Sequence, residues 1–361
     1  MKKTRLLALL LAFCALLGLP GCSLLSGYKT NRLKAIASYS VESGVYPQSV
    51  IPVEDGWFAL IGNYGETGYA VTFGATPDKL KTIYEENESR VWFIEAKGSL
   101  AAWSDKTVLD DHSATYRFRV YDRSKEMITE FYIAECEEFY PENIGIYGRN
   151  VYWCATDAEK ETAEIRSYSV DSGTTETVFK SAYNGEDSLS CLTVDGEYLS
   201  VAHWNREGQP MVTVLSLATG QVVIEQILPS WVRHVFAVSY DSTNSKVVLY
   251  LLRGNGKESL YAFPSDGGEY DDEGLFLICD FKEGIYAYHD RVKCRDGHVY
   301  WIFQLNRTGN VSDHYFLADY SFRSDKITEY RRTYAFSVEG ERMYTLSFNR
   351  QNYTAVDLRP F

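Results

Sequence analysis

Residues 194–228 decide the fold, because they contain four short strand-like segments arranged as two hairpins. VDGEYLSVA (194–202) places a strand on each side of an Asp-Gly turn, and MVTVLSLATGQVVIEQIL (211–228) repeats the design around Thr-Gly. Asp-Gly supplies the positive φ that tight hairpins need. The chain has 28 Tyr, 18 Phe and 7 Trp, which favour strands, and no long stretch has the apolar spacing of a helix. We therefore predict one antiparallel sheet of four strands.

The same unit recurs along the chain, about every 40 to 55 residues. Its first hairpin occurs seven times, as VEDGWFALIG (53–62), EAKGSLAAW (95–103), YGRNVYWCA (147–155), VDGEYLSVA (194–202), YDSTNSKVVLYLL (240–252), RDGHVYWIF (295–303) and VEGERMYTL (338–346). Clear second hairpins follow at 117–133, 163–179, 211–228 and 314–332. This repetition predicts an all-β, seven-bladed β-propeller of four-stranded antiparallel blades. A β-sandwich would not repeat one pair of hairpins at this period.

The two ends of the chain are predicted to share one blade. The last unit, residues 336–361, has material for only three strands. The segment KAIASYSVESG (34–44) precedes the first blade, and its sequence is similar to RSYSVDSG (166–173), which belongs to a third strand. Its distance from the Gly56 turn instead matches that of an outer strand, and 352–358 already fill the third position of the last blade. We therefore expect an N-terminal outer strand to close the ring, which removes its open edges.

The first residues, MKKTRLLALLLAFCALLGLPGC, are typical of a secretory signal, with a basic start and an apolar run too short to span a membrane comfortably. Leu19-Pro20-Gly21-Cys22 resembles a bacterial lipobox, although Pro20 replaces the small residue usual there. The resemblance implies cleavage before Cys22 and a diacylglycerol on its thiol. An ordinary signal peptide with a chance cysteine is the alternative. The expected organisation is a lipoprotein signal peptide (1–21), a lipidated cysteine and short tether (22–32) and the propeller (33–361).

The charge of the chain limits its partners. The net charge is −13, and it becomes −16 when Lys2, Lys3 and Arg5 leave with the signal. Such a surface offers no basic stripe to nucleic acid or to anionic lipid, so we expect no nucleic-acid partner. We expect the acyl group, rather than charge, to hold a monomer at the extracytoplasmic face of a bacterial membrane.

The repeat resembles the broad superfamily of seven-bladed propellers with WD40-like or YVTN-like repeats. SLATGQVV (216–223) is similar to the Thr-Gly turn of quinoprotein-type propellers, but it occurs once. The Gly-His and Trp-Asp signatures of true WD40 repeats are missing. The resemblance therefore implies the fold and carries no catalytic residue to this chain.

Aromatic residues stand near the start of each expected inner strand. In such a propeller these connections lie on one face, around the central mouth, where aromatic rings could stack on sugars or grip a peptide. Alternatively, the rings wedge between neighbouring blades. The residues are Tyr46, Trp92, Tyr140, Tyr183, Trp231, Tyr288 and Tyr334.

Charged turn residues and two histidines complete the candidate mouth. WNREGQ (204–209), LNRTGN (305–310) and FNRQNY (348–353) place Arg206, Arg307 and Arg350 in equivalent turns, where they could face an anionic ligand or simply contact solvent. His234 and His289 follow the aromatics of blades five and six. Without a characteristic spacing they favour hydrogen-bonding histidines over a metal site, and we expect no metal and no cofactor.

The sequence therefore favours a non-catalytic, lipid-anchored propeller that binds or scaffolds a protein, peptide or glycan at the cell envelope. No Gly-rich phosphate loop and no nucleophile elbow is present. The alternative is a propeller-fold carbohydrate-active enzyme, a glycoside hydrolase or polysaccharide lyase, with carboxylates such as Glu142 or Asp187 at the mouth. Clustered carboxylates facing one cavity would distinguish the enzyme from the binding protein.

Overall fold

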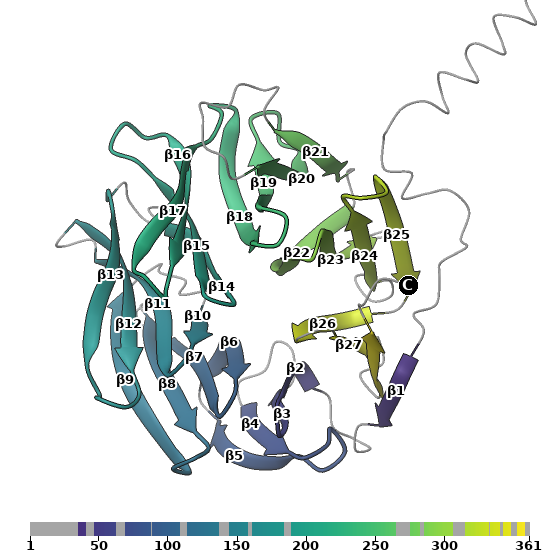
Figure 1. Cartoon of the computed structure of the whole chain (residues 1–361). Coiled ribbons are helices and arrows are strands. Elements are labelled where there is room, and N and C mark those ends of the chain that lie inside the picture. The colour runs from purple at the N-terminus through teal and green to yellow at the C-terminus, as the bar shows by residue number, and fades with distance from the viewer. Residues whose placement is uncertain are drawn as a thin grey trace, which may run out of the picture.

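The computed structural model forms a ring of seven blades (Figure 1), and the inner strands line a cavity in its central channel. It describes residues 35–40, 47–62, 69–87, 89–108, 114–136, 144–157, 161–183, 189–264, 275–281, 285–305, 315–331, 333–339, 342–347 and 352–357. These residues form seven antiparallel sheets of four strands each, so the predicted fold is confirmed. Within these ranges, no helix long and apolar enough to cross a membrane is found.

Each blade contributes one strand to each of four concentric positions, and we number the blades 1 to 7 in chain order. The inner strands are β2 (Pro47–Val53), β6 (Arg90–Lys97), β10 (Ile144–Tyr147), β14 (Leu189–Asp195), β18 (Val232–Asp241), β22 (Ile285–Arg295) and β26 (Thr333–Glu339). The second strands are β3 (Gly56–Gly62), β7 (Leu100–Val108), β11 (Asn150–Asp157), β15 (Tyr198–Trp204), β19 (Lys246–Arg253), β23 (His298–Leu305) and β27 (Arg342–Ser347).

The third and outer strands come from the second hairpins. The third strands are β4 (Tyr69–Gly74), β8 (Ala114–Asp122), β12 (Thr162–Ser169), β16 (Pro210–Ser216), β20 (Glu258–Pro264), β24 (Tyr315–Ser321) and β28 (Asn352–Asp357). The outer strands are β5 (Lys81–Glu86), β9 (Met127–Cys136), β13 (Thr175–Ser181), β17 (Gln221–Ile227), β21 (Phe276–Asp280), β25 (Lys326–Arg331) and β1 (Ala35–Ser40).

The last blade contains both ends of the described chain, as predicted. Its strand order is β1-β28-β27-β26, and Tyr39 of β1 lies opposite Tyr353 of β28. The N-terminal segment is therefore the outer strand and not a third strand. Figure 1 shows β1, at the purple end of the colour scale, beside the yellow strands of blade 7. Hydrogen bonds along β28 hold the first strand of the chain in its last blade.

Apolar clusters fill the spaces between neighbouring blades. In the described part of the chain, seven clusters of buried residues are found, and each joins two consecutive blades. Trp301 of β23 and Tyr250 of β19, for example, lie in the cluster of blades 5 and 6. The cluster with Trp57, Tyr334 and Leu346 joins blade 7 to blade 1, so the ring of interfaces is continuous. Large aromatics suit these wedge-shaped spaces because each removes about 150–250 Å² from water.

Ion pairs reinforce the interfaces on the face that carries the inner hairpin turns. Arg149, in the turn before β11, contacts Asp122 of blade 2 and donates to Asp171 Oδ1 of its own blade at 3.0 Å. This guanidinium, helped by the hydroxyl of Ser124, lowers the pKa of Asp122 to about 2. Arg123 pairs with Asp55 of blade 1 at 2.7 Å. These contacts connect blades 1, 2 and 3 outside the apolar clusters.

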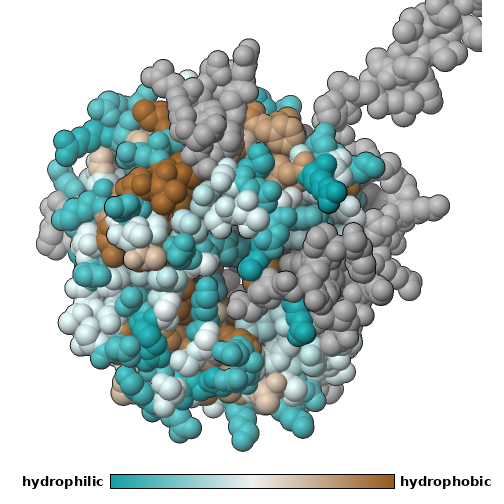
Figure 2. Space-filling view, viewed as in Figure 1, coloured by the Kyte–Doolittle hydropathy of each residue, from teal (hydrophilic) through white to brown (hydrophobic). Residues whose placement is uncertain are grey.

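The outer strands expose some apolar side chains. Val222, Val223 and Ile227 of β17 are each about half exposed. Figure 2 shows brown apolar patches where Figure 1 places β16 and β17, on a face that is otherwise mostly hydrophilic or intermediate. Met127 and Ile133 of β9, and Phe276 and Leu277 of β21, are also exposed, so among the described residues several outer strands carry exposed apolar side chains.

Candidate functional site

A cavity of about 410 Å³ lies in the central channel. Among the described residues, every inner strand except β18 lines it. The lining residues of β6, β14 and β22 lie in the second half of each strand, next to the turn that leads to the second strand. The cavity is therefore displaced toward the face of the inner hairpin turns.

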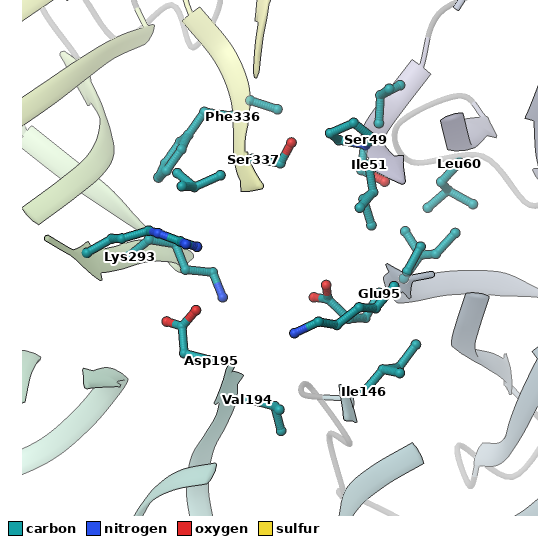
Figure 3. A pocket seen from close by; sticks show the side chains of 18 of the residues that line it. Ser49, Ile51, Leu60, Glu95, Ile146, Val194, Asp195, Lys293, Phe336 and Ser337 are labelled. Atoms are coloured by element: carbon teal, nitrogen blue, oxygen red, sulfur yellow. The ribbon is translucent and has the colours of Figure 1, made fainter. Parts of the chain in front are cut away.

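Charged side chains of opposite sign face this cavity from three blades. Figure 3 shows Lys293 of β22 and Asp195 of β14 pointing toward one another, with the Glu95 carboxylate of β6 facing them across the cavity. Lys97 and Arg295 also line it. The alternation of a strand places Glu95 with Lys97, and Lys293 with Arg295, on one face. The channel thus combines two carboxylates with three cations.

The charges in the channel influence one another, because the inner strands partly bury them around one cavity. Burial raises the pKa of Glu95, and the Asp195 carboxylate adds to this, although Lys293 opposes it. Burial alone would lower the pKa of Lys293, but Asp195 and Glu95 outweigh it and raise that pKa. Lys293 is therefore held as a cation, whereas the negative charge on Glu95 is incompletely compensated.

A buried hydroxyl fixes the geometry of the Asp195–Lys293 pair. Ser239 of β18 is fully buried and donates to Asp195 Oδ2 at 3.2 Å. Ser239 Oγ in turn accepts a hydrogen bond from the backbone N–H of Cys294 at 2.9 Å. Because Cys294 follows Lys293, one serine orders the strands that carry both charges. Inner strand β18 therefore supports the site without lining it.

Apolar residues form the remaining walls, and a close approach of two strands shapes one of them. Figure 3 shows Ile51, Ile146 and Val194 around the charged groups. A Cβ on Gly145 of β10 would lie 2.1 Å from Cγ2 of Val194, so β10 can approach β14 only because residue 145 is glycine. The cavity is therefore lined by both apolar and charged side chains.

The lining combines charged, polar and apolar side chains. Within the described ranges, no group of three or more metal-binding side chains is found. Burial raises the pKa of the Cys294 thiol well above its usual value, which opposes formation of a thiolate nucleophile. The lining can offer charge pairing and apolar contact.

Three of the predicted mouth aromatics have described side chains, and packing within the protein occupies two of them. Tyr334 is buried between blades 7 and 1 and donates its hydroxyl to Gln48 Oε1 at 2.9 Å. Trp231 is half-buried, with its ring 5.4 Å from that of Tyr261 and the Arg253 guanidinium 5.1 Å from its centroid. Tyr183 is partly buried after β13.

The other predicted residues are placed as follows. Arg206 is exposed in the turn between β15 and β16, and the His234 ring of β18 lies 4.7 Å from Phe236. Trp92 lies in β6, and Tyr288 and His289 lie in β22, but only their backbone is described. None of these described residues lines the cavity. That they form a ligand-binding mouth stays a prediction. Predicted residues outside the described ranges are Cys22, Tyr46, Tyr140, Arg307 and Arg350, as are Glu142 and Asp187.

Sequence reasoning did not identify the residues that line the cavity. Glu95, Asp195 and Lys293 all precede turns that the sequence does predict, in EAKG (95–98), VDG (194–196) and KCRDG (293–297). The usable signal was charge on alternate residues of an inner strand, as in Glu95 and Lys97. An inner strand packs against both neighbouring blades, so a charge there implies that its side chain faces the channel.

Comparisons with known proteins identify the architecture. No protein-family model matches the chain, and no curated protein sequence does. A chain of the mitotic checkpoint complex is 9% identical, with 92% of this chain and 94% of that chain covered at a TM-score of 0.51. A prolyl endopeptidase is also 9% identical, covers 89% of this chain at a TM-score of 0.53, and is matched over only 51% of its own length. TolB from Acinetobacter baumannii is 10% identical, with 85% and 78% covered and a TM-score of 0.43.

The chain has the fold of a β-propeller. At these identities the likeness shows the fold alone, and the activities of the matched proteins are their own.

Proposed function

We propose that this propeller is a lipid-anchored protein of the outer side of a bacterial membrane, and that it binds a protein, peptide or glycan in its channel without catalysis. The cavity carries the proposal, because it offers opposed charges and apolar walls. Its volume of about 410 Å³ falls within the range of about 300–1,000 Å³ usual for ligand sites. The anchor is supported by the basic, apolar leader that ends at Cys22.

Co-purification from native membranes tests the binding proposal. The full chain and the variants Glu95→Gln and Lys293→Met are purified in mild detergent, and the bound molecules are identified by mass spectrometry. We expect a ligand or partner with the unaltered chain that both variants lose. Glu207→Gln and Lys257→Met, at exposed turn residues distant from the cavity, are matched controls that should retain it. Equal recovery from the channel variants and from the unaltered chain would refute the channel as the site.

The lipid anchor is tested separately. Mass spectrometry of the N-terminal peptide of the membrane-bound protein should find a diacylglycerol on Cys22, and Cys22→Ser should release the protein from the membrane fraction. Two acyl chains, rather than one, give stable attachment. A membrane-bound Cys22→Ser variant, or an unmodified Cys22, would contradict the proposal.

One observation favours the enzyme as a second candidate. Glu95 and Asp195 face one cavity, and burial raises the pKa of Glu95, as in carboxyl pairs that work as acid and base. Incubation with a panel of cell-wall and plant oligosaccharides tests this function, and the binding proposal expects no turnover. Hydrolysis that Glu95→Gln abolishes would replace the binding proposal with the enzyme.

A further inference from the structure

Four of the five charges in the channel form two couples of opposite sign, and the fifth, Arg295, pairs with Asp296 at 3.5 Å. Lys293 faces Asp195, and Lys97 lies two residues from Glu95 on the same face of β6 and acts to lower the pKa of that carboxyl. No ion pair of 4.0 Å or less joins these four groups in the described part of the chain. The two charges of each couple are therefore not in direct contact, and a ligand in the cavity can contact both the carboxylates and the ammonium groups.

The protein holds these groups apart at a cost, because charges removed from water are unfavourable unless they are paired closely. Ser239 donates a hydrogen bond to Asp195 on one side, and on the other side Lys293 and Lys97 compensate the charge of Glu95 only in part. An ammonium group beside Glu95 would supply the missing positive charge. A carboxylate could be accepted by Lys293 or Lys97, because an ammonium forms strong, charge-assisted hydrogen bonds with it.

The remainder of the lining selects for size and polarity. Ile51, Ile146 and Val194 would contact an apolar side chain. Phe336 is the sole aromatic among the described lining residues, so the cavity lacks the paired aromatic faces on which a neutral sugar would stack. A cavity of about 410 Å³ admits a small molecule or the end of a peptide rather than the surface of a folded domain.

From these features we infer that the channel binds a zwitterion, a free amino acid or short peptide in which both the ammonium and the carboxylate are unblocked. The inference rests on the proposed function and specifies its ligand class. Glu95 and Asp195 receive the ammonium, Lys293 and Lys97 receive the carboxylate, and the apolar walls contact the side chain. Both charges of the ligand are required, because either one alone would leave a couple of the protein unbalanced.

The test is equilibrium dialysis of the full chain in mild detergent against two matched ligand sets. The first contains the free dipeptides in which alanine precedes each amino acid, and the second contains the same dipeptides acetylated and amidated. We expect saturable retention of at least one free dipeptide, no retention of its capped form, and affinity at least about tenfold weaker in Lys293→Met and in Glu95→Gln. Lys257→Met and Glu207→Gln should bind as the unaltered chain does, and thermal unfolding checks that every variant is folded.

The possible failures are distinguishable. Retention of no dipeptide, or equal retention of free and capped forms, overturns the zwitterion. If no dipeptide is retained but the co-purification described above finds another ligand that Lys293→Met loses, the inference fails while channel binding stands. If nothing depends on the channel variants, the proposed function fails as well.

Discussion

Two clusters of charge in this propeller have similar chemistry and opposite surroundings. In blade 2, Asp105 of β7 is fully buried and pairs with Arg119 of β8, while the hydroxyl of Tyr69 in blade 1 donates to Asp105 Oδ2 at 3.2 Å. Arg119 also bonds Glu130 at 3.0 Å and lies 5.1 Å from the ring centroid of Tyr84. In the channel, Glu95, Asp195 and Lys293 face open volume.

The difference between the clusters is whether a charged side chain finds its partners inside the protein or faces a cavity that a ligand can enter. The cluster of Asp105 and Arg119 is buried and obtains its partners within blades 1 and 2. The channel charges obtain only part of their compensation from the protein, so their remaining interactions are available to a second molecule. We expect changes in the first cluster to alter stability, and changes in the second to alter binding.

Loss of Asp105 should have the largest effect on stability. Asp105→Ala leaves the buried Arg119 without its closest partner and should lower the free energy of unfolding by about 3–5 kcal/mol, measured by urea denaturation. Asp55→Ala removes an exposed partner of Arg123 and should cost less than about 1 kcal/mol. Equal losses in the two variants would show that burial does not distinguish these ion pairs.

A neutral buried cluster extends the comparison to pH. The His203 ring in blade 4 contacts Ser181 Oγ at 2.9 Å and Thr213 Oγ1 at 2.8 Å, and burial lowers its pKa to about 4 from 6.5. Between these values the unfolded chain binds more protons than the folded one, so acidification favours unfolding. We expect acidification from about pH 7.5 to about pH 4.5 to cost about 2–3 kcal/mol more in the unaltered chain than in His203→Gln.

The His203→Gln control also separates the pH dependence caused by His203 from that caused by a second histidine, His298. The bond to Asp319 raises the pKa of His298, which adds stability at low pH that is lost as the pH rises. His298 is present in both proteins, so its contribution cancels in the difference. Identical pH profiles for the two proteins would show that His203 is not held neutral.

Gly145 tests the packing behind the channel wall. Gly145→Ala places a methyl group against Val194 and should lower stability by about 1–3 kcal/mol. Val194→Ala in the same chain should restore part of that loss, because the obstructing atoms are removed. Additive losses in a double-mutant cycle would show that β10 and β14 do not approach each other as described.

Lys293→Met should have only a small effect on stability, about 1 kcal/mol or less, because its two acidic neighbours face a cavity where they can take up protons. The same change should abolish ligand retention. A loss of stability as large as that of Asp105→Ala would place Lys293 among the charges that hold the fold.

The sequence predicts the blades well because local rules determine them. Gly196 and Gly297, at the predicted turns, have φ of +59° and +80°, and the spacing of the N-terminal segment places β1 as an outer strand. The channel charges are harder to predict. Asp195 and Lys293 are 98 residues apart, and they converge only because the ring brings blades 4 and 6 together at its axis.

The predicted aromatics illustrate the same limit. Tyr334 stands where a mouth residue is expected, yet its ring fills the space between the last and first blades. Position along an inner strand can be counted from the sequence. Whether a side chain turns toward the channel or toward the neighbouring blade depends on the shape of that interface, which involves residues from both ends of the chain.

The most direct measurement compares ligand retention and the free energy of unfolding in one variant of each cluster. The full chain, Lys293→Met and Asp105→Asn are each purified from native membranes, and both the bound ligand per folded protein and the free energy of unfolding are determined. We expect Lys293→Met to lose its ligand at nearly unchanged stability, and Asp105→Asn to lose stability while its folded fraction keeps the ligand. Retention of the ligand by Lys293→Met, or loss of both properties together in either variant, would contradict the assignment of the channel to binding.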